Sequence, residues 1–533
     1  MFILQNISYI HSDRELLFDN INLSVNSKEK VAIIGNNGTG KSTLLKIIAG
    51  QISQSTGNIT ISSKPYYVPQ IVGQFDNLTV AQAIGIADRL NALSEILSGN
   101  VTEENLLALN DDWTIEKRCQ EALSCWKLDD LDLNAKMQTL SGGQKTKVFL
   151  AGIKIHNPEI VLLDEPSNHL DLSARNLLYQ FIKETSCSVA VVSHDRTLLN
   201  GLDKMCELNR CGIKIYGGNY DFYNEQKTLE NTVLINSLEE KQKTLRKAKI
   251  TEREAIERQQ KRELQGKKNL NKSNIAPILT GGRKNNAENT TAKMKDVHAD
   301  KINAIAQELN DLRKEIPERD KMKFGFDNSA LHKGKVLFTA TNINFSYDTQ
   351  PLWNENLTFQ ITSGERIALK GQNGSGKTTL IKLILGNLTP QTGTGYRAEN
   401  KMVYIDQDYS LLDNTLSIYE QALQFNTSAL QECEIKTRLN RFLFTKDDWD
   451  KSCRVLSGGE RMRLMLCCLT ISSKSPDIIM FDEPTNNLDI QNIEILTAAI
   501  NEYRGTIIVV SHDETFLEEI NIEWIMELTP III

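Results

Sequence analysis

Four short stretches of this chain occur twice, in the same order, and this repetition restricts the fold more than any other feature of the sequence. The pairs are GNNGTGKST (35–43) and GQNGSGKTT (371–379), LSGGQ (140–144) and LSGGE (456–460), DEPSNHLDL (164–172) and DEPTNNLDI (482–490), and VVSHD (191–195 and 509–513). The chain therefore contains two copies of one domain.

The spacing of the repeats predicts where the copies begin and end. We expect one domain at 1–220, a linker at 221–335 and a second domain at 336–533. The first copy has about 20 more residues between its glycine loop and its LSGG, 99 against 79 from the loop lysine to the leucine. We expect these extra residues to form helices at about 80–125.

Short apolar runs precede the repeated motifs, and helical stretches separate the runs. Examples are VAII before the first glycine loop, IVLL before Asp164 and VAVV before Ser193. Such runs are typical of buried strands in a largely parallel sheet. The fold class expected is therefore α/β in both copies, each with a strand–loop–helix unit at its glycine loop.

Both glycine loops match G-x-x-x-x-G-K-[ST], whose backbone N–H groups hold phosphate oxygens at the start of a helix. The lysine adds positive charge at the β- and γ-phosphates, and the next hydroxyl binds Mg²⁺. The phosphate-binding residues expected are Gly35, Asn36, Gly38, Thr39, Gly40, Lys41, Ser42 and Thr43, and Gly371, Asn373, Gly374, Ser375, Gly376, Lys377, Thr378 and Thr379.

The repeated acid pairs follow buried strands, where an ionised carboxylate needs a partner. A Mg²⁺ held by nucleotide phosphates is such a partner for Asp164 and Asp482. The following residues, Glu165 and Glu483, are placed to act as general bases on the attacking water. A structural ion pair is the alternative interpretation of each pair.

Two further pairs complete the predicted sites. His194 and His512 end another apolar run, 30 residues after each acid, and are interpreted as γ-phosphate sensors. Gln70 and Gln407 are candidates for the shell of the metal and the water, so the predicted metal residues are Ser42, Gln70, Asp164, Thr378, Gln407 and Asp482. The LSGG stretches predict helix N-termini that bind an anion, which suggests that the nucleotide is held from two sides. Their residues are Ser141, Gly142, Gly143, Ser457, Gly458 and Gly459.

Composition excludes several other classes of protein. The nine cysteines form no C-x-x-C pair, which argues against a zinc ribbon or a disulfide framework. No apolar run approaches 18 residues, and the first ten residues do not resemble a signal peptide. We therefore expect a cytoplasmic protein.

Together these motifs resemble the nucleotide-binding domains of ATP-binding cassette (ABC) proteins. The resemblance implies an Mg²⁺-dependent ATP hydrolase whose two domains face each other head to tail. Lys41 would then share one ATP with Ser457 and Gly459, and Lys377 a second with Ser141 and Gly143. It also implies that an aromatic residue stacks on each adenine, and Tyr9 and Tyr347 are the candidates.

The arrangement of the whole chain resembles the ABC-F group of translation factors. It has two cassettes, a charged linker, and the run YGGNYDFYNEQK (216–227) leading into the linker. The longer first cassette would carry a short arm. Glu460 in place of glutamine and Asn487 in place of histidine depart from the usual pattern, so the two sites can differ in rate.

The linker is basic although the chain as a whole carries a net charge of −7. Residues 241–284 contain 14 Lys+Arg and 4 Asp+Glu, a net of +10. We expect two antiparallel helices at about 225–268 and 291–316, with apolar positions spaced as in a coiled coil. Those positions are Leu234, Leu238, Leu245, Ala248 and Ala255 in the first helix and Ile302, Ile305, Leu309, Leu312 and Ile316 in the second.

The loop between the two helices, at about 269–290, contains Pro277 and a Gly–Gly pair. Exposed apolar side chains at the end of a basic hairpin favour RNA as the partner. The RNA-binding candidates are Lys267, Lys268, Lys272, Arg283 and Lys284. By resemblance, the target is the tRNA exit site of the ribosome, with rRNA and tRNA as partners and neither DNA nor a membrane involved.

The leading hypothesis is a monomeric ribosome-bound ATPase that relieves stalled or mispositioned peptidyl-tRNA through its linker. Protection of the ribosome against antibiotics is the alternative. An ATPase subunit of a membrane transporter is a third possibility, but the basic hairpin would have no role there. A DNA-repair ATPase or an iron–sulfur relative would need cysteine clusters that this sequence lacks.

Overall fold

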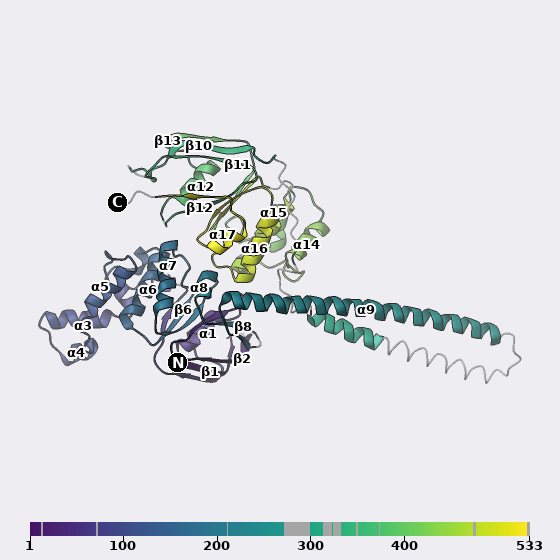
Figure 1. The fold of residues 1–533 in the computed structure, drawn as a ribbon, viewed down its shortest axis with the longest axis horizontal. Coiled ribbons are helices and arrows are strands. Elements are labelled where there is room, and N and C mark those ends of the chain that lie inside the picture. The colour runs from purple at the N-terminus through teal and green to yellow at the C-terminus, as the bar shows by residue number, and fades with distance from the viewer. Residues whose placement is uncertain are drawn as a thin grey trace. The chain divides into compact units, whose positions relative to one another are not determined.

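A computed structural model describes residues 1–11, 14–70, 73–210, 212–270, 299–312, 322, 332–347, 350–372, 374–472 and 476–529 (Figure 1). The chain divides into two compact units. Met1–Tyr223 with Met322–Ile533 forms one, and Asn224–Lys321 forms the other. Each unit is described by itself.

The first copy is built on a six-stranded sheet with the order β5-β6-β7-β3-β8-β9. All neighbouring pairs are parallel except β8 and β9. The strands are β3 (Lys30–Ile34), β5 (Tyr66–Val68), β6 (Ile160–Asp164), β7 (Ser188–Val192), β8 (Lys204–Asn209) and β9 (Gly212–Tyr216). Every residue of β6 and β7 is buried, as the apolar runs predicted for a sheet covered on both faces.

A smaller antiparallel sheet covers the glycine-loop helix of the first copy. It has the order β2-β1-β4, from β1 (Phe2–Ile10), β2 (Leu16–Val25) and β4 (Thr56–Ile61). Helix α1 (Lys41–Ile48) packs its leucines and isoleucines against both sheets in one apolar cluster. The glycine loop is thus held between two layers.

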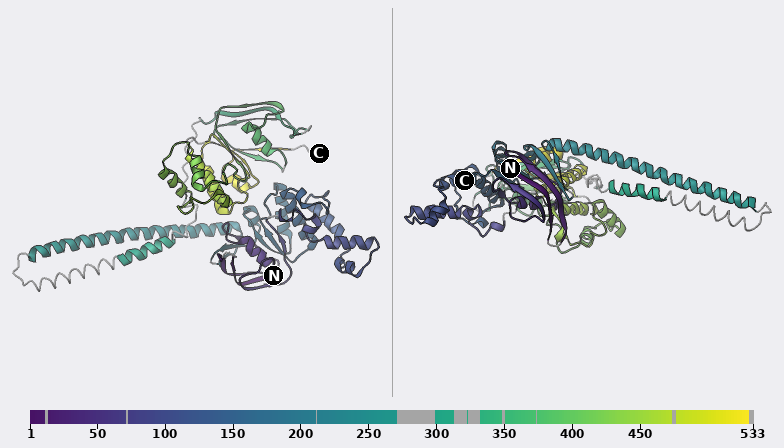
Figure 2. Two further views of the ribbon diagram at one scale, coloured as in Figure 1. Left: turned by 180° about the vertical axis from the view of Figure 1, so that it is seen from behind. Right: turned by 90° about the horizontal axis from the view of Figure 1, so that it is seen from below.

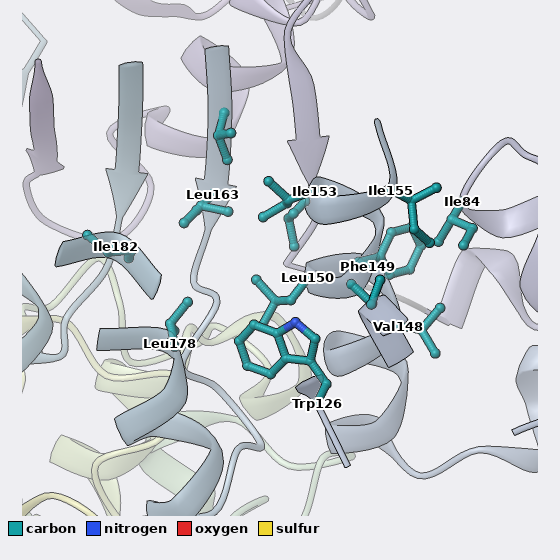
Figure 3. Packing of buried hydrophobic residues seen from close by; sticks show 14 of the residues in the cluster. Ile84, Trp126, Val148, Phe149, Leu150, Ile153, Ile155, Leu163, Leu178 and Ile182 are labelled. Atoms are coloured by element: carbon teal, nitrogen blue, oxygen red, sulfur yellow. The ribbon is translucent and has the colours of Figure 1, made fainter. Parts of the chain in front are cut away.

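Helices cover the other side of the large sheet. They are α2 (Val80–Ala83), α5 (Ile115–Cys125), α6 (Gly142–His156), α7 (Leu172–Glu184) and α8 (Arg196–Asn200), with short 3₁₀ turns at Gly73–Phe75 and Met137–Thr139. Helix α3 (Ala87–Leu97) packs on α2 and α5, and α4 (Glu103–Leu109) packs on α3 at the outer end of this layer (Figure 1). Figure 3 shows the ring of Trp126, just after α5, next to Leu150 of α6, with Leu178 of α7 to one side. This cluster ties the helical layer to the sheet.

The second copy repeats the plan. Its strands are β10 (Val336–Asn344), β11 (Leu357–Thr362), β12 (Arg366–Lys370), β13 (Thr392–Arg397), β14 (Met402–Ile405), β15 (Ile478–Asp482), β16 (Thr506–Val510) and β17 (Trp524–Glu527). They form a parallel sheet, β14-β15-β16-β12-β17, and an antiparallel sheet, β11-β10-β13, with α12 (Lys377–Leu385) between the two (Figure 1). The predicted α/β class with a duplicated P-loop domain is confirmed.

The two helical layers differ by one insertion. The second copy has α13 (Ile418–Gln424), α14 (Glu432–Arg441), α15 (Gly458–Ile471), α16 (Ile490–Glu502), α17 (Glu514–Glu519) and a 3₁₀ turn at Cys453–Val455. Helices α2 and α13 both start with a capping box, and each N-cap residue bridges to the segment before its LSGG. Helices α3 and α4 lie between α2 and α5 in the first copy, where the sequence predicted the extra residues.

The second unit contains most of a long helix, α9 (Tyr220–Leu270), and a helix at residues 299–312. The two run side by side in Figures 1 and 2, and Lys241 of α9 forms an ion pair with Glu308. Ile305 and Leu309 are buried, and Leu238 and Leu245 are half-buried. These are positions of the predicted apolar seam, whereas Ile316 and Pro317 lie outside the described residues.

None of the helices in the described ranges combines the length and the apolar character needed to cross a membrane.

Candidate active site

The first glycine loop turns into α1 at Gly40, which has a left-handed backbone (φ 93°). A β-carbon at Gly40 would lie 2.7 Å from Leu17 Cδ2, so only glycine fits. Lys41 is buried, and its Nζ donates hydrogen bonds to the carbonyls of Gly35 at 2.6 Å and Asn36 at 3.0 Å. Burial lowers the pKa of Lys41, and the nearby carboxyl of Glu165 opposes this shift. The ammonium group is therefore held at the mouth of the loop, where phosphates would bind.

Oxygen ligands suited to a hard divalent cation meet at the end of β6. Ser42 Oγ donates to Asp164 Oδ1 at 3.0 Å, and Tyr67 Oη donates to Asp164 Oδ2 at 3.0 Å. Burial raises the pKa of Asp164, and these two hydrogen bonds oppose the shift. A hydroxyl and a carboxylate 3.0 Å apart fit Mg²⁺, which takes few protein ligands and completes its shell with phosphate and water.

Glu165 and His194 face each other next to this carboxylate. Glu165 has a left-handed backbone (φ 49°), and its N–H donates to Val192 O at 2.8 Å, which turns the side chain out of the sheet. His194 Nε2 lies 3.3 Å from Glu165 Oε1. Burial raises the pKa of Glu165 and lowers the pKa of His194 well below its usual value. The histidine is therefore neutral, and the carboxyl is poised to accept or hold a proton at a neutral pH.

The second copy repeats these contacts. Lys377 Nζ donates to Gly371 O at 2.7 Å, and Thr378 Oγ1 donates to Asp482 Oδ2 at 3.3 Å. His512 Nε2 lies 3.4 Å from Glu483 Oε1, and Glu483 has a φ of 48°. Tyr404, the counterpart of Tyr67, donates to Asp482 Oδ2 at 2.8 Å; this tyrosine pair was not identified from the sequence. Both predicted sets of lysine, hydroxyl, acid pair and histidine are brought together.

The pKa of Glu483 gives a prediction for the pH dependence of the hydrolysis. Burial raises the pKa of Glu483 to about 7, and a general base must be ionised. In a Glu165→Gln variant, where Glu483 is the remaining base, kcat/KM should rise about tenfold per pH unit up to about pH 7 and then level off. Initial rates of phosphate release from pH 5.5 to 9 measure this, and a flat profile below pH 7 would contradict the assignment.

The first site includes residues of the second copy. A cavity of about 400 Å³ is lined by Lys41, Ser42, Gln70, Glu165 and His194 on one side and by Ser457 and Asn487 on the other. The N–H of Asn37 donates to Asp489 Oδ2 at 2.8 Å. In the second site the carboxyl of Asp171, the counterpart of Asp489, lies near enough to Lys377 to oppose the lowering of its pKa.

The remaining predicted residues are placed as follows. Ser141 and Ser457 are the N-cap residues of α6 and α15, with their glycines in the first turn. Gln407 lies in a turn just after β14. Lys267 and Lys268 lie on α9, where the structure does not describe their side chains, and Asn373, Lys272, Arg283 and Lys284 lie outside the described residues.

The structure favours His11 over Tyr9 as the aromatic residue of the first nucleotide site. His11 lines the cavity, whereas Tyr9 is half-buried and packs on Phe18. His11 stands 24 residues before Gly35, and Tyr347 stands 24 residues before its own glycine loop, whereas Tyr9 stands 26 before.

The ring contacts agree with this register. Tyr9 and His11 pack edge to face with centroids 5.4 Å apart, and Phe345 and Tyr347 do so at 5.1 Å. The counterpart of Tyr347 is thus His11, and Tyr9 corresponds to Phe345. Spacing alone could have found this residue, but a search for tyrosine passes over it. In the second copy, Tyr347 Oη lies 3.0 Å from Thr379 Oγ1.

Comparisons with known proteins identify the family. The ABC transporter family matches residues 18–168 and 354–486, together more than half of the chain. The putative ATP-binding protein YdiF of Bacillus subtilis is 30% identical over 95% of this chain and 77% of its own. ABC transporter F family member 2 of Arabidopsis thaliana is 30% identical over 97% of this chain and 75% of its own.

Solved structures show the same fold. That of the RNase-L inhibitor superimposes with a TM-score of 0.61 at 21% identity, over 98% of this chain and 87% of that one. A complex of an archaeal ribosomal stalk protein with an archaeal ribosome recycling factor gives 0.60 at 20% identity, over 98% of this chain and 87% of that one.

Proposed function

The chain belongs to the F family of ATP-binding cassette proteins and is an ABC-type ATPase, and from this premise we propose that it acts on the ribosome. ATP with Mg²⁺ binds between a cassette at 1–220 and a cassette at 336–533. The two cassettes close on ATP and open after hydrolysis, and the linker at 221–335 transmits this change to rRNA and tRNA near the tRNA exit site. The protein would work in the cytoplasm as a monomer.

The basic surface of α9 is the observation that carries this proposal. Helix α9 exposes Arg246, Lys247, Lys249, Lys261 and Arg262, and other cations of the helix form i,i+4 pairs with glutamates. The chain as a whole carries a net charge of −7, so this positive surface is a local feature. Lysine and arginine on one helix of an acidic protein favour a polyanion as the partner.

The first cassette contacts the start of α9 through α8. The predicted phosphate sensor His194 is two residues before α8, which begins at Arg196. The guanidinium of Arg196 lies 6.0 Å from the centre of the Tyr220 ring, and it also pairs with Glu519 of α17. Asn200, at the end of α8, exchanges two hydrogen bonds of 3.0 Å with Asp221. A shift of the γ-phosphate contact can therefore reach the base of the linker through one short helix.

Cosedimentation with ribosomes at increasing salt concentration tests the proposal. Binding should weaken steeply, because each phosphate contact releases counterions. Replacing Lys267, Lys268, Lys272, Arg283 and Lys284 by glutamine should reduce the slope of log K against log salt by up to about 0.7–0.9 per charge.

The matched control replaces five exposed lysines of the cassettes, which are Lys64, Lys117, Lys154, Lys183 and Lys446. It should leave the slope nearly unchanged. Equal slopes for the two variants, or no cosedimentation of the parent protein with ATP present, would contradict a ribosomal role carried by the linker. In a drug-sensitive host, unchanged growth inhibition by lincosamides, pleuromutilins, macrolides and phenicols would count against antibiotic protection.

The reassignment of the adenine contact gives a separate prediction. A phenol ring offers a larger apolar face than an imidazole, so His11→Tyr should strengthen ATP binding at the first site about threefold. Tyr347→His should weaken binding at the second site by a similar factor. ATP titrations in a Lys377→Ala or a Lys41→Ala background isolate each site. Tyr9→Leu is the control, and a loss of affinity with Tyr9→Leu that exceeds the effect at His11 would restore the original assignment.

A further inference from the structure

Helices α6 and α15, which begin at the two LSGG stretches, are capped by similar but unequal contacts. In α6, the Ser141 N–H donates to Gln144 Oε1 at 2.9 Å, and the Gln144 N–H donates to Ser141 Oγ at 3.3 Å. In α15, the Ser457 N–H donates to Glu460 Oε2 at 2.8 Å, and the Glu460 N–H donates to Ser457 Oγ at 3.3 Å. Both helices therefore have a complete capping box.

The second helix has one contact more. The hydroxyl of Ser457 donates a hydrogen bond to Glu460 Oε2 at 2.7 Å. A serine hydroxyl has a single proton, so Ser457 cannot donate to Glu460 and to a phosphate at the same time. In the described contacts of the first capping box, the amide of Gln144 takes the backbone N–H of Ser141 and leaves its hydroxyl proton unused.

Glu460 also changes the charge of a nucleotide site. Ser457 lines the cavity that contains Lys41, so Glu460, which touches Ser457, stands beside the first site. An anion is favoured at a helix N-terminus, and a carboxylate in the first turn competes with a second anion for the same N–H groups and the same field. Two features thus distinguish the first site. Its LSGG serine, Ser457, already donates a hydrogen bond to Glu460, and its aromatic residue is the imidazole of His11, where the other site has the phenol of Tyr347.

We propose that Glu460 is a positioning residue that holds the Ser457 hydroxyl away from the nucleotide and makes the site of Lys41 the weaker of the two ATP sites. On closure, the γ-phosphate accepts a hydrogen bond from the Ser457 hydroxyl only after the hydrogen bond from this hydroxyl to Glu460 breaks. The site of Lys377, completed by Ser141 with the neutral Gln144, has no such competitor and retains ATP longer. This inference concerns ATP binding without ribosomes, so it stands or falls separately from the ribosomal role.

The test is a calorimetric titration of ATP and Mg²⁺ into the full chain carrying Glu165→Gln and Glu483→Gln, which prevents hydrolysis. We expect two classes of sites that differ about tenfold in Kd, the value of one hydrogen bond to a charged group. Lys41→Ala should remove the weaker class, and Lys377→Ala the tighter one. Two sites of equal affinity in the parent would overturn the proposal.

Exchange of the capping residues supplies the matched pair. Glu460→Gln copies the capping box of the first helix and should tighten the weaker class about tenfold, at an unchanged melting temperature. Gln144→Glu should weaken the tighter class by a similar factor. Glu460→Ala, which removes the cap, should lower the melting temperature and so separates capping from binding. If Glu460→Gln leaves the weaker class unchanged while the protein stays folded, Glu460 does not hold the serine back.

Discussion

Replacing Glu165 and Glu483 together by glutamine is expected to lower the turnover number for ATP by about 10²–10⁴, the range of general base catalysis. Each glutamate lies beside a neutral histidine, with ring nitrogens 3.3 and 3.4 Å from a carboxyl oxygen. An amide has the same shape but cannot take a proton from water. ATP binding should remain, because the variant leaves the two glycine loops and the aspartates Asp164 and Asp482 unchanged.

The stability of the double variant provides an independent check. Burial raises the pKa of Glu165 to about 8 and that of Glu483 to about 7, so at pH 8 the folded protein holds Glu483 largely ionised and Glu165 partly ionised, against the cost of burial. Neutral amides avoid that cost, and the melting temperature at pH 8 should not fall. The control is Glu159→Gln with Glu523→Gln, two exposed glutamates whose loss should leave turnover unchanged.

Because the double variant binds ATP without hydrolysing it, the proposed function predicts that it accumulates on ribosomes. Turnover within threefold of the parent would exclude these glutamates as general bases. Loss of turnover with recovery of the protein only in ribosome-free fractions, with ATP present, would retain the catalytic assignment and contradict the ribosomal one.

The catalytic groups could be predicted from the sequence because local patterns place them. A glycine loop sets its own backbone and the start of its helix, and a buried apolar run that ends in acids puts them at one edge of a parallel sheet. Lys41, Asp164 and His194 meet for that reason alone. The left-handed backbone of Glu165 is different, since its sequence neighbours do not signal it and the hydrogen bond to Val192 O is needed to hold it.

The features missed from the sequence depend on register or on single atoms. His11 depends on register: it stands 24 residues before its glycine loop, as Tyr347 does, and the alignment of β1 with β10 agrees, because Asn6 and Asn342 share a φ of 52° at equal distances from the two loops. The hydrogen bond between Ser457 and Glu460 is a rotamer choice, which no residue pattern specifies. The sequence predicted that the linker helix starts at about 225, whereas α9 starts five residues earlier, at Tyr220. The hydrogen bonds of Asp221 with Asn200, which is distant in sequence, stabilise this earlier start.

Replacing Ser141 and Ser457 together by phenylalanine is the second change from which we expect a large effect, a loss of at least about 100-fold in hydrolysis. Ser457 lines the cavity of about 400 Å³ on the side opposite Lys41, so a bulky ring there would occupy space that the triphosphate needs. The hydrogen bond from Asn37 to Asp489 shows how closely the two copies approach at this site. A phenylalanine ring at the start of both α6 and α15 should therefore block closure of the two cassettes at both sites, while each glycine loop can still bind one nucleotide.

Loss of the two N-caps alone would cost about 1 kcal/mol per helix, so the control must remove caps elsewhere. Thr79→Ala with Ser417→Ala does this, because both residues cap helices through the same kind of capping box, at α2 and α13. The variant with Thr79→Ala and Ser417→Ala should match the phenylalanine variant in stability and should hydrolyse ATP at the rate of the parent protein. Equilibrium binding of ATP and phosphate release, measured on all three proteins, distinguish the outcomes. If the phenylalanine variant hydrolyses ATP at the rate of the cap control, each cassette works alone, and ATP cannot be what closes one on the other.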